Sequence, residues 1–384
     1  MKKPLERNRI RRLVAPVATR IRQSPALLSL TRRGKSRLLG TQEVWQVTAE
    51  TVDPRYRVDF RAMLPTRYRA NIGFIASKQD PTVPYFQRAL EMLGIGGQVY
   101  DPARDDFHDR ILAGPERIFL SRPMHFTNQD RQLFWEKTLP LYDWSEASVS
   151  PSRRALNIYE SKRELAYFLK MNGIPHPETH IFYDMEEALA FAKDCPLPQV
   201  FKTNTGSSAT GVEILRERKA LIALVRDVFC RHYVKRSLSD YRDIDYGHVI
   251  LQKFITPVRE FRVIRVGESW FGHEKLPGAE SELMSGSGIN AWTPPPRDLL
   301  NFCAGLSDQL GFSMMCFDIF RSGDGPWLVN EMQTWFGSYD NSQMYIDGVP
   351  GRYTRKDGKW VFEPGFFNEC CSLPLIIANA ISSG

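Results

Sequence analysis

Residues 313–333, SMMCFDIFRSGDGPWLVNEMQ, form the stretch of sequence that decides the fold of this chain. Two apolar runs flank the turn signal GDG at 323–325, and this pattern predicts a β-hairpin. Asp318 lies inside the first run, where a buried carboxylate is costly unless it has a partner. Glu331 and Gln333 lie two residues apart in the second run, so they share one face of that strand. The hairpin therefore brings oxygen-bearing side chains together.

These oxygen donors have two interpretations. Mg²⁺ prefers oxygen ligands and takes few of them from the protein when phosphates and water supply the rest. Asp318, Glu331 and Gln333 are accordingly candidate metal ligands. The alternative is that Asp318 pairs with a nearby Lys or Arg. Strand alternation places Asn330 on the opposite face, outside this candidate site.

A candidate phosphate-binding segment, FKTNTGSSATGVEIL, covers residues 201–215. Lys202 ends a strand, and residues 203–211 are rich in Gly, Ser and Thr. Small residues allow close backbone approach, so successive N–H groups can point at a phosphate while the lysine supplies a point charge. The segment lacks the GxxxxGK[ST] pattern of a P-loop. A flexible hairpin tip is the alternative.

Two further strand segments carry candidate residues. HVILQKFI at 248–255 predicts a strand whose exposed end reads an adenine edge with backbone groups, or else a plain core strand. In REFRVIRVGESWFGHEK at 259–275, alternation places Glu260 and Arg262 on one face and Arg259 on the other. Cations aimed at one place suit a phosphoryl group, whereas a surface ladder of ion pairs is the alternative.

The order of elements predicts the fold class, which is α/β followed by α+β. In residues 66–150 strands alternate with amphipathic helices, which implies a parallel sheet covered by helices. This Rossmann-like unit lacks the GxGxxG fingerprint of a dinucleotide site. Residues 151–255 and 256–384 then carry two runs of strands with packed helices. Residues 1–65 form a basic extension.

Taken in order, these segments resemble the ATP-grasp superfamily, in particular its branch of glutathione-synthetase-like and ribosomal-protein glutamate ligases. The resemblance lies in Lys202 with its Gly/Ser loop, the LQKFI hinge, EFR with a downstream base, and Asp318 with Glu331-x-Gln333. The segment ESKRELAYFLKMNGIPHPET, which contains Lys162, resembles the junction with the nucleotide-binding lobe. The implied fold is a Rossmann-like pre-ATP-grasp domain followed by a two-lobed ATP-grasp fold.

The resemblance implies a nucleotide site for ATP. Lys162 and Lys202 would contact its phosphates, and residues 206–211 would form a mobile flap over them. The strand end at 252–255 would hold the adenine, and Glu260 or a neighbour would reach the ribose. The implied nucleotide-binding set comprises Lys162, Lys202, Gly206, Ser207, Ser208, Gly211, Gln252, Lys253, Phe254, Ile255 and Glu260.

The resemblance also implies the catalytic and metal-binding residues. Arg262 and Lys275 would be the catalytic cations that face the transferred phosphoryl group. Asp318, Glu331 and Gln333 would hold two Mg²⁺ ions, with Mn²⁺ as an alternative ion. Catalysis would then rest on positioning and charge neutralisation, without a covalent enzyme intermediate.

The implied activity is an ATP-dependent carboxylate–amine ligase. Such an enzyme phosphorylates a carboxylate to an acyl phosphate, which an amine then attacks, with release of ADP and phosphate. Amino acids, peptides and uronic-acid sugars are all open as substrates. One alternative keeps the fold and phosphorylates a small-molecule hydroxyl. A second alternative is a non-catalytic nucleotide-binding protein.

Three departures from the family pattern concern the substrates and the metal. Gln333 stands where Asn is common. The segment PGAESELMSGSGINAW offers no arginine, and contains Glu280 and Glu282 instead. The segment MQTWFGSYDNSQMYIDG at 332–348 is rich in aromatic and amide side chains. It predicts either a wall that binds the acceptor or an aromatic lid that packs on the core.

Charge and composition predict the compartment and the partners. Residues 1–40 carry a net charge of +11, whereas the whole chain carries +7, so this arm accounts for the basic pI. We expect a solubilising extension, or a weak contact with an anionic surface, and no specific nucleic acid. The six cysteines lack metal-ligand spacing, which favours reduced thiols in a cytoplasmic protein. A homodimer is kept as an option.

Overall fold

The computed structural model describes most of the chain beyond the basic arm. All of the described residues belong to one unit, Asp53–Lys235 with Arg242–Gly384. The predictions on residues 1–40 lie outside the described residues. The structure describes residues 53–65, 68, 70–78, 80–123, 128–206, 211–231, 233–234, 244–256, 258–277, 284, 289–337 and 342–383.

A four-stranded parallel sheet forms first along the chain, as the alternation of strands and helices predicts. Its strand order is β2-β1-β3-β4, so the order reverses between β1 and β3. The elements are η1 (Pro54–Tyr56), η2 (Phe60–Met63), β1 (Ile72–Ile75), α4 (Val83–Leu93), β2 (Gly97–Tyr100), α5 (Phe107–Ala113), β3 (Ile118–Ser121), α6 (Asn128–Asp143) and β4 (Ser148–Ser150).

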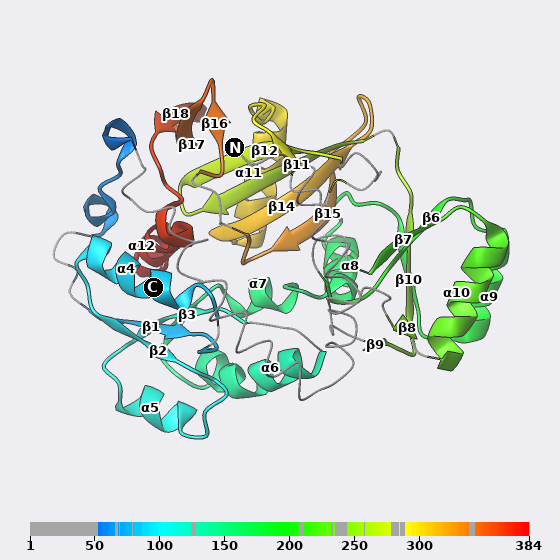
Figure 1. The fold of residues 1–384 in the computed structure, drawn as a ribbon, viewed down its shortest axis with the longest axis horizontal. Helices are drawn as coiled ribbons and strands as arrows, with labels where there is room; N and C mark the ends of the chain where they lie inside the picture. The colour runs from blue at the N-terminus through cyan, green and yellow to red at the C-terminus, as the bar shows by residue number, and fades with distance from the viewer. Residues whose placement is uncertain are drawn as a thin grey trace, which may run out of the picture. The chain divides into compact units, whose positions relative to one another are not determined.

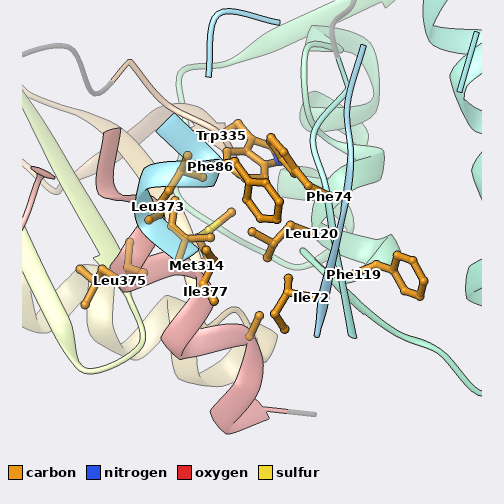
Figure 2. Close-up of a cluster of buried hydrophobic side chains, with 14 of the residues drawn as sticks. Ile72, Phe74, Phe86, Phe119, Leu120, Met314, Trp335, Leu373, Leu375 and Ile377 are labelled. Carbon is orange, nitrogen blue, oxygen red and sulfur yellow. The ribbon is translucent and has the colours of Figure 1, made fainter. Parts of the chain in front are cut away.

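The core of this first sheet extends to the far end of the sequence. The C-terminal helix α12 (Leu373–Ser383) is buried along almost its whole length. Figure 2 shows Leu373 and Ile377 of that helix beside Phe86 and Leu120, in one cluster of buried side chains. Trp335 joins the same cluster. Residues from 335 onward therefore complete the hydrophobic core of the first sheet. The domain boundaries given above stay a prediction.

A second, antiparallel sheet lies in the middle of the sequence, with α9 and α10 packed beside it (Figure 1). Its strand order is β5-β10-β6-β7. The elements from α7 to β10 are α7 (Arg153–Asn157), α8 (Lys162–Met171), β5 (Thr179–Phe182), α9 (Met185–Asp194), β6 (Gln199–Lys202), β7 (Val212–Leu215), α10 (Arg218–Arg231), β8 (Tyr233–Val234), β9 (Ile244–Asp245) and β10 (Val249–Lys253).

The third sheet is antiparallel and contains the predicted hairpin. Its strand order is β15-β14-β11-β12-β17-β16, with β13 paired to β12 and β18 paired to β17. The elements are β11 (Arg259–Val266), β12 (Ser269–Leu276), β13 (Ile289–Ala291), α11 (Arg297–Leu310), β14 (Met314–Arg321), β15 (Leu328–Gln333), β16 (Tyr345–Ile346), β17 (Val349–Lys356), β18 (Lys359–Pro364) and η3 (Glu369–Ser372).

The two faces of this third sheet differ. Apolar side chains of one face, including Phe261, Trp270 and Phe317, pack with residues of α11 in a single core. Because side chains alternate along a strand, the residues between them point to the other face. That second face carries the charged residues from which the candidate site is built. None of the helices in the described part of the chain has the length and hydropathy needed to cross a bilayer.

Candidate active site

A single row of residues crosses the third sheet from strand to strand. Glu331 of β15 is the register partner of Asp318 of β14, which is also the partner of Arg262 of β11. Arg262 is in turn the partner of His273 of β12. Residues that are partners across antiparallel strands lie on the same face at close spacing. Two carboxylates, a guanidinium and an imidazole therefore stand side by side.

Asp318 is held by two cations. Arg262 donates to both of its oxygens, from Nε to Oδ1 at 2.9 Å and from Nη2 to Oδ2 at 2.8 Å. Lys275 Nζ donates to Oδ2 at 2.6 Å. Burial raises the pKa of Asp318, but the charges of Arg262 and Lys275 outweigh it and hold that pKa well below its usual range. Asp318 is thus ionised and paired, as one sequence interpretation expects.

Lys275 joins Asp318 to Glu260. Its ammonium also donates to Glu260 Oε1 at 2.8 Å, and both residues are buried. Burial lowers the pKa of Lys275, but the negative charges of Asp318 and Glu260 raise it on balance. Glu260 therefore lies in the charged cluster of the third sheet. Its predicted contact with a ribose stays a prediction.

The opposite face of the same strands carries a separate ion pair. Arg259 donates to Glu274 from Nε at 2.7 Å and from Nη2 at 2.8 Å, and the Arg259 side chain is 56% exposed. The ion-pair interpretation of this segment therefore holds for Arg259 and Glu274, while the interpretation that its cations face a phosphoryl group stays a prediction. The surface pair involves Arg259, and the buried cluster involves Glu260 and Arg262.

Strand β15 contains a bulge that changes the role of Asn330. The register pairs Asp318 with Glu331 but Ile319 with Val329, so Asn330 is an extra residue in the ladder. Its Oδ1 accepts a hydrogen bond from Lys202 Nζ at 2.9 Å. The expectation that Asn330 lies outside the site is therefore wrong, because a bulge breaks the strict alternation of side chains.

Gln333 contacts both the candidate metal carboxylate and the junction before α8. Its Nε2 donates to Glu331 Oε1 at 2.8 Å, and its Oε1 accepts from the Glu160 N–H at 3.2 Å. The amide thus orients Glu331. Within the described ranges no group of three or more His, Cys, Asp or Glu residues gathers around one point. The binding of Mg²⁺ by Asp318, Glu331 and Gln333 stays a prediction, in which phosphates and water would supply the remaining ligands.

Lys162 of α8 and Lys202 of β6 are close enough for their charges to interact. Lys162, the first residue of α8, donates from Nζ to Gly206 O at 2.7 Å. The helix start is fixed by Asn204, whose carbonyl accepts from the Lys162 N–H at 2.9 Å. Burial and the nearby charge of Lys162 lower the pKa of Lys202 to about 8, against the opposing charges of Glu331 and Glu260. Asn204 was missed by the sequence analysis, which treated it as one of many small polar loop residues.

The flap is described only at its two ends. Gly206 and Gly211 have φ values of 124° and 77°. A Cβ at Gly211 would lie 1.9 Å from Thr203 Oγ1, so the close approach and the backbone conformation both require glycine there. Ser207 and Ser208 lie outside the described residues. The ends of the segment have the geometry expected of a Gly-rich loop.

The predicted adenine strand emerges from the sheet where expected. Strand β10 is paired on both sides as far as Gln252 and Lys253, and Gln252 Nε2 also donates to Thr179 Oγ1 at 2.9 Å. Phe254 and Ile255 follow outside any strand. Lys253 is exposed and Phe254 is half-buried. The Lys253 N–H donates to Glu178 O at 2.8 Å, and the contact of this strand end with adenine stays a prediction.

The aromatic segment after Gln333 divides into two parts. Trp335 and Phe336 are buried in the core of the first sheet, where Trp335 Nε1 donates to Ser121 O at 2.8 Å. Tyr345 instead contacts Trp292 on the third sheet's side. Residues 338–341 lie outside the described residues. In the described part of the segment, Trp335 and Phe336 therefore pack in the core, whereas the Tyr345 ring lies against Trp292.

No family model matches this chain, but one curated protein resembles part of it. The α-aminoadipate–LysW ligase LysX of Saccharolobus solfataricus is 26% identical over 178 residues, which is 45% of this chain and 60% of that protein. The chain thus spans less than two thirds of that curated relative.

Solved structures extend the comparison. The D-cycloserine synthetase DcsG is 16% identical, with a TM-score of 0.54 over 81% of this chain and 99% of that chain. A RimK-domain ATP-grasp protein from Sphaerobacter thermophilus is 18% identical, with a TM-score of 0.49 over 68% of this chain and 90% of that chain. The likeness to DcsG extends over nearly all of that protein and shows a shared fold.

Proposed function

We propose that this chain, whose fold is that of the ATP-grasp ligases as the sequence predicted, is an ATP-dependent carboxylate–amine ligase. One observation carries the proposal. Glu331, Asp318 and Arg262 form a continuous row. Lys202 lies at the Glu331 end of this row, where its Nζ donates to Asn330 Oδ1 at 2.9 Å. Anionic, cationic and phosphate-attracting groups thus adjoin one another, as phosphoryl transfer to a carboxylate requires.

The proposed reaction has two steps. A carboxylate oxygen of the acid attacks the γ-phosphorus of ATP, the bond to the β-phosphate oxygen breaks, and ADP leaves. An amine then attacks the carbonyl carbon of the acyl phosphate, which expels phosphate and leaves an amide after the amine loses its proton. The protein contributes position and electrostatic stabilisation to both steps.

Each charged residue has a proposed task. Lys162 and Lys202 bind the phosphates of ATP below the flap formed by residues 206–211. Arg262 and Lys275 orient the acid and balance negative charge on the transferred phosphoryl group. Their ion pairs with Asp318 hold both cations in fixed positions.

Mg²⁺ fits the carboxylate end of the row. Asp318 and Glu331 are register partners, and Gln333 orients the Glu331 carboxylate. When bound, Mg²⁺ would neutralise phosphate charge and align the γ-phosphate. Two ions and replacement by Mn²⁺ remain part of the proposal, as does the use of Gln333 as a ligand.

The nucleotide base and ribose complete the proposed site. Gln252, Lys253, Phe254 and Ile255 lie at or just beyond the end of β10 and are the proposed contacts of the adenine. Glu260 is the proposed ribose contact carried over from the family pattern, although its carboxylate accepts from Lys275. Its replacement separates these two roles, because only a ribose contact changes the preference for ATP over deoxy-ATP.

A second candidate function is supported by the hydrogen bonds that Asp318 already accepts. Both of its oxygens accept hydrogen bonds from cations of the chain itself. A protein that binds nucleotide without turnover would use Arg262 and Lys275 as internal replacements for the metal. The hydroxyl kinase shares the proposed site, and the chemical test below separates it from a ligase.

The test is a screen for ADP release with pooled carboxylates and pooled amines, with hydroxylamine as a trap. A ligase yields ADP only when an acid is present, and the trapped acyl phosphate appears as a hydroxamate. A stable phosphorylated alcohol would identify a kinase. Nucleotide binding without ADP release in any pool would identify the non-catalytic alternative. Glu331→Ala serves as the negative control.

The partners beyond the substrates are also proposals. A small-molecule or peptide acid and an amine are the proposed substrates, and the relative LysX is by its name a ligase for α-aminoadipate and LysW. Contact of residues 1–40 with an anionic surface, a homodimer and a cytoplasmic location are carried over from the sequence. Deleting residues 1–40 should leave turnover unchanged if the arm acts only as a tether.

A further inference from the structure

The charged row does not end at His273. Strand β13 pairs with β12 so that Ala291 is the partner of Glu274. Trp292, the next residue, has its indole centroid 5.5 Å from the His273 ring at an interplanar angle of 65°. Tyr345 of β16 follows, with its ring centroid 4.8 Å from Trp292 at 71°. The row therefore runs from carboxylates through cations into an aromatic group of three rings.

The character of the row changes abruptly after Arg262. His273 is buried, and burial lowers its pKa to about 4, so the imidazole is neutral at pH 7. Its Nδ1–H donates to Gln343 O at 3.0 Å, which fixes the ring. Trp292 remains 38% exposed although it contacts two other rings. A ligand at this end of the row would meet the exposed part of Trp292, with the neutral His273 ring packed against it.

The direction of the proposed reaction determines which part of a ligand reaches these rings. Phosphates belong at the Lys202 end, because that lysine adjoins Asn330 and Glu331. The attacking carboxylate oxygen lies in line with the leaving oxygen and on the far side of the γ-phosphorus. An acid held at Arg262 therefore extends its body away from ATP and toward His273 and Trp292.

We propose that His273, Trp292 and Tyr345 form the wall that receives the body of the acid substrate, and that this body is an uncharged aromatic ring. The inference rests on the proposed ligase function and adds the substrate class. Edge-to-face and offset-stacked contacts between rings stabilise a complex beyond simple burial. A second carboxylate on the substrate would lose its hydration at this wall, because the three rings of the wall offer it no formal positive charge.

The binding test compares three probes that share one carboxylate. Phenylacetate carries a ring, succinate carries a second negative charge, and 4-aminobutyrate carries a positive charge. Dissociation constants are measured by ligand-observed NMR with the full chain and Mg·ADP. We expect phenylacetate to bind about tenfold more tightly than succinate, which is the size of one favourable aromatic contact. Equal affinities, or tightest binding of 4-aminobutyrate through a cation–π contact, would overturn the inference.

Variants of Trp292 tie any preference to this wall. Trp292→Ala should weaken phenylacetate binding about tenfold, whereas Trp292→Phe, which keeps a ring, should stay within about twofold. Trp144→Ala is the matched control, because Trp144 is 82% exposed and lies just after α6. A loss of the same size in Trp144→Ala, or no loss in Trp292→Ala, would contradict the assignment.

A measurement of nucleotide binding distinguishes a failure of the proposed function from a failure of the aromatic wall. The affinity for Mg·ADP should be unchanged in every Trp292 variant, because the wall lies at the other end of the row. A chain that binds no adenine nucleotide would overturn both the proposed function and this inference. A chain that binds nucleotide but shows no preference for phenylacetate would overturn the inference alone.

Discussion

Lys202 Nζ donates a hydrogen bond to Asn330 Oδ1 at 2.9 Å, and this contact joins the end of β6 to the bulge of β15. The two residues are far apart in the sequence and belong to different sheets. Their contact sets a cation beside the Glu331 carboxylate before any ligand is bound. Nucleotide phosphates would enter a site whose charges are already arranged, which reduces the cost of reorganisation.

The pKa of Lys202 predicts a pH dependence of nucleotide binding. Burial and the charge of Lys162 lower this pKa to about 8, so Lys202 is charged at pH 7 and loses its proton as the pH rises through 8. The dissociation constant for Mg·ATP should therefore increase between pH 7 and 9. Titration calorimetry across this range measures the effect.

Two variants act as controls for this pH effect. Lys202→Arg keeps its charge over the whole range and should flatten the profile. Lys170→Met removes an exposed lysine from the end of α8 and should leave the profile unchanged. A wild-type affinity that stays constant from pH 7 to 9 would exclude contact between Lys202 and the phosphates.

The buried cluster around Asp318 predicts a large loss of stability when one charge is removed. Asp318→Asn leaves half-buried Arg262 and buried Lys275 with less compensating charge, and should lower the free energy of unfolding by about 3–5 kcal/mol. Glu274→Gln breaks the pair with exposed Arg259 on the opposite face and should cost at most about 1 kcal/mol. Urea denaturation at pH 7 compares the two variants.

The lowered pKa of Asp318 sets the pH range of this contribution. A carboxyl whose folded-state pKa lies below its unfolded value stabilises the fold above the unfolded pKa, about 4, and loses that contribution as the pH falls further. The difference between wild type and Asp318→Asn should thus shrink below pH 4. A difference that is small at pH 7 would show that the cluster contributes little to the fold.

Removal of the Glu331 carboxylate should affect turnover and leave the fold intact. Glu331 is only partly buried, and its replacement by Ala removes the proposed metal carboxylate while Lys202 keeps its hydrogen bond to Asn330 and Arg262 keeps its ion pair with Asp318. We expect ADP release to fall about 100-fold or more, with an unchanged melting temperature in the absence of nucleotide. Retained turnover in Glu331→Ala would remove Glu331 from the metal site.

The hydrogen bond from Trp335 to Ser121 should stabilise the packing of the segment after β15 on the first sheet. Trp335→Phe keeps an aromatic ring but removes the N–H that donates to Ser121 O at 2.8 Å. A buried carbonyl without its donor should cost about 1–3 kcal/mol in the free energy of unfolding. Trp144→Phe, at an exposed position, should change it by less than about 0.5 kcal/mol. Equal free energies of unfolding for the two variants would show that the Trp335–Ser121 hydrogen bond does not stabilise the fold.

The local patterns of the sequence were sufficient for much of the fold. Strand–helix alternation predicted the parallel first sheet, and the GDG turn predicted the β14–β15 hairpin. Two-residue periodicity correctly separated Arg259 from Glu260 and Arg262. These features depend on neighbours along the chain, which is the information that a single sequence contains.

Other features depend on contacts between distant segments. The bulge at Asn330 follows from pairing with β14, so alternation alone gave the wrong face. The rings of His273, Trp292 and Tyr345 come from three separate strands or loops and meet only in the folded sheet. The burial of α12 against the first sheet likewise needed three-dimensional contacts. The aromatic composition of residues 332–348 marked the segment that contains Tyr345, but no local pattern indicated that this ring meets Trp292 and His273.

The path of one oxygen atom tests the central claim most directly. An acid that supports ADP release is labelled with ¹⁸O in its carboxylate and incubated with Mg·ATP and an amine. Attack of that carboxylate on ATP predicts one ¹⁸O atom in each phosphate released, because the oxygen leaves with the phosphoryl group. Phosphate without label, formed at the rate of amide formation, would contradict the acyl-phosphate mechanism.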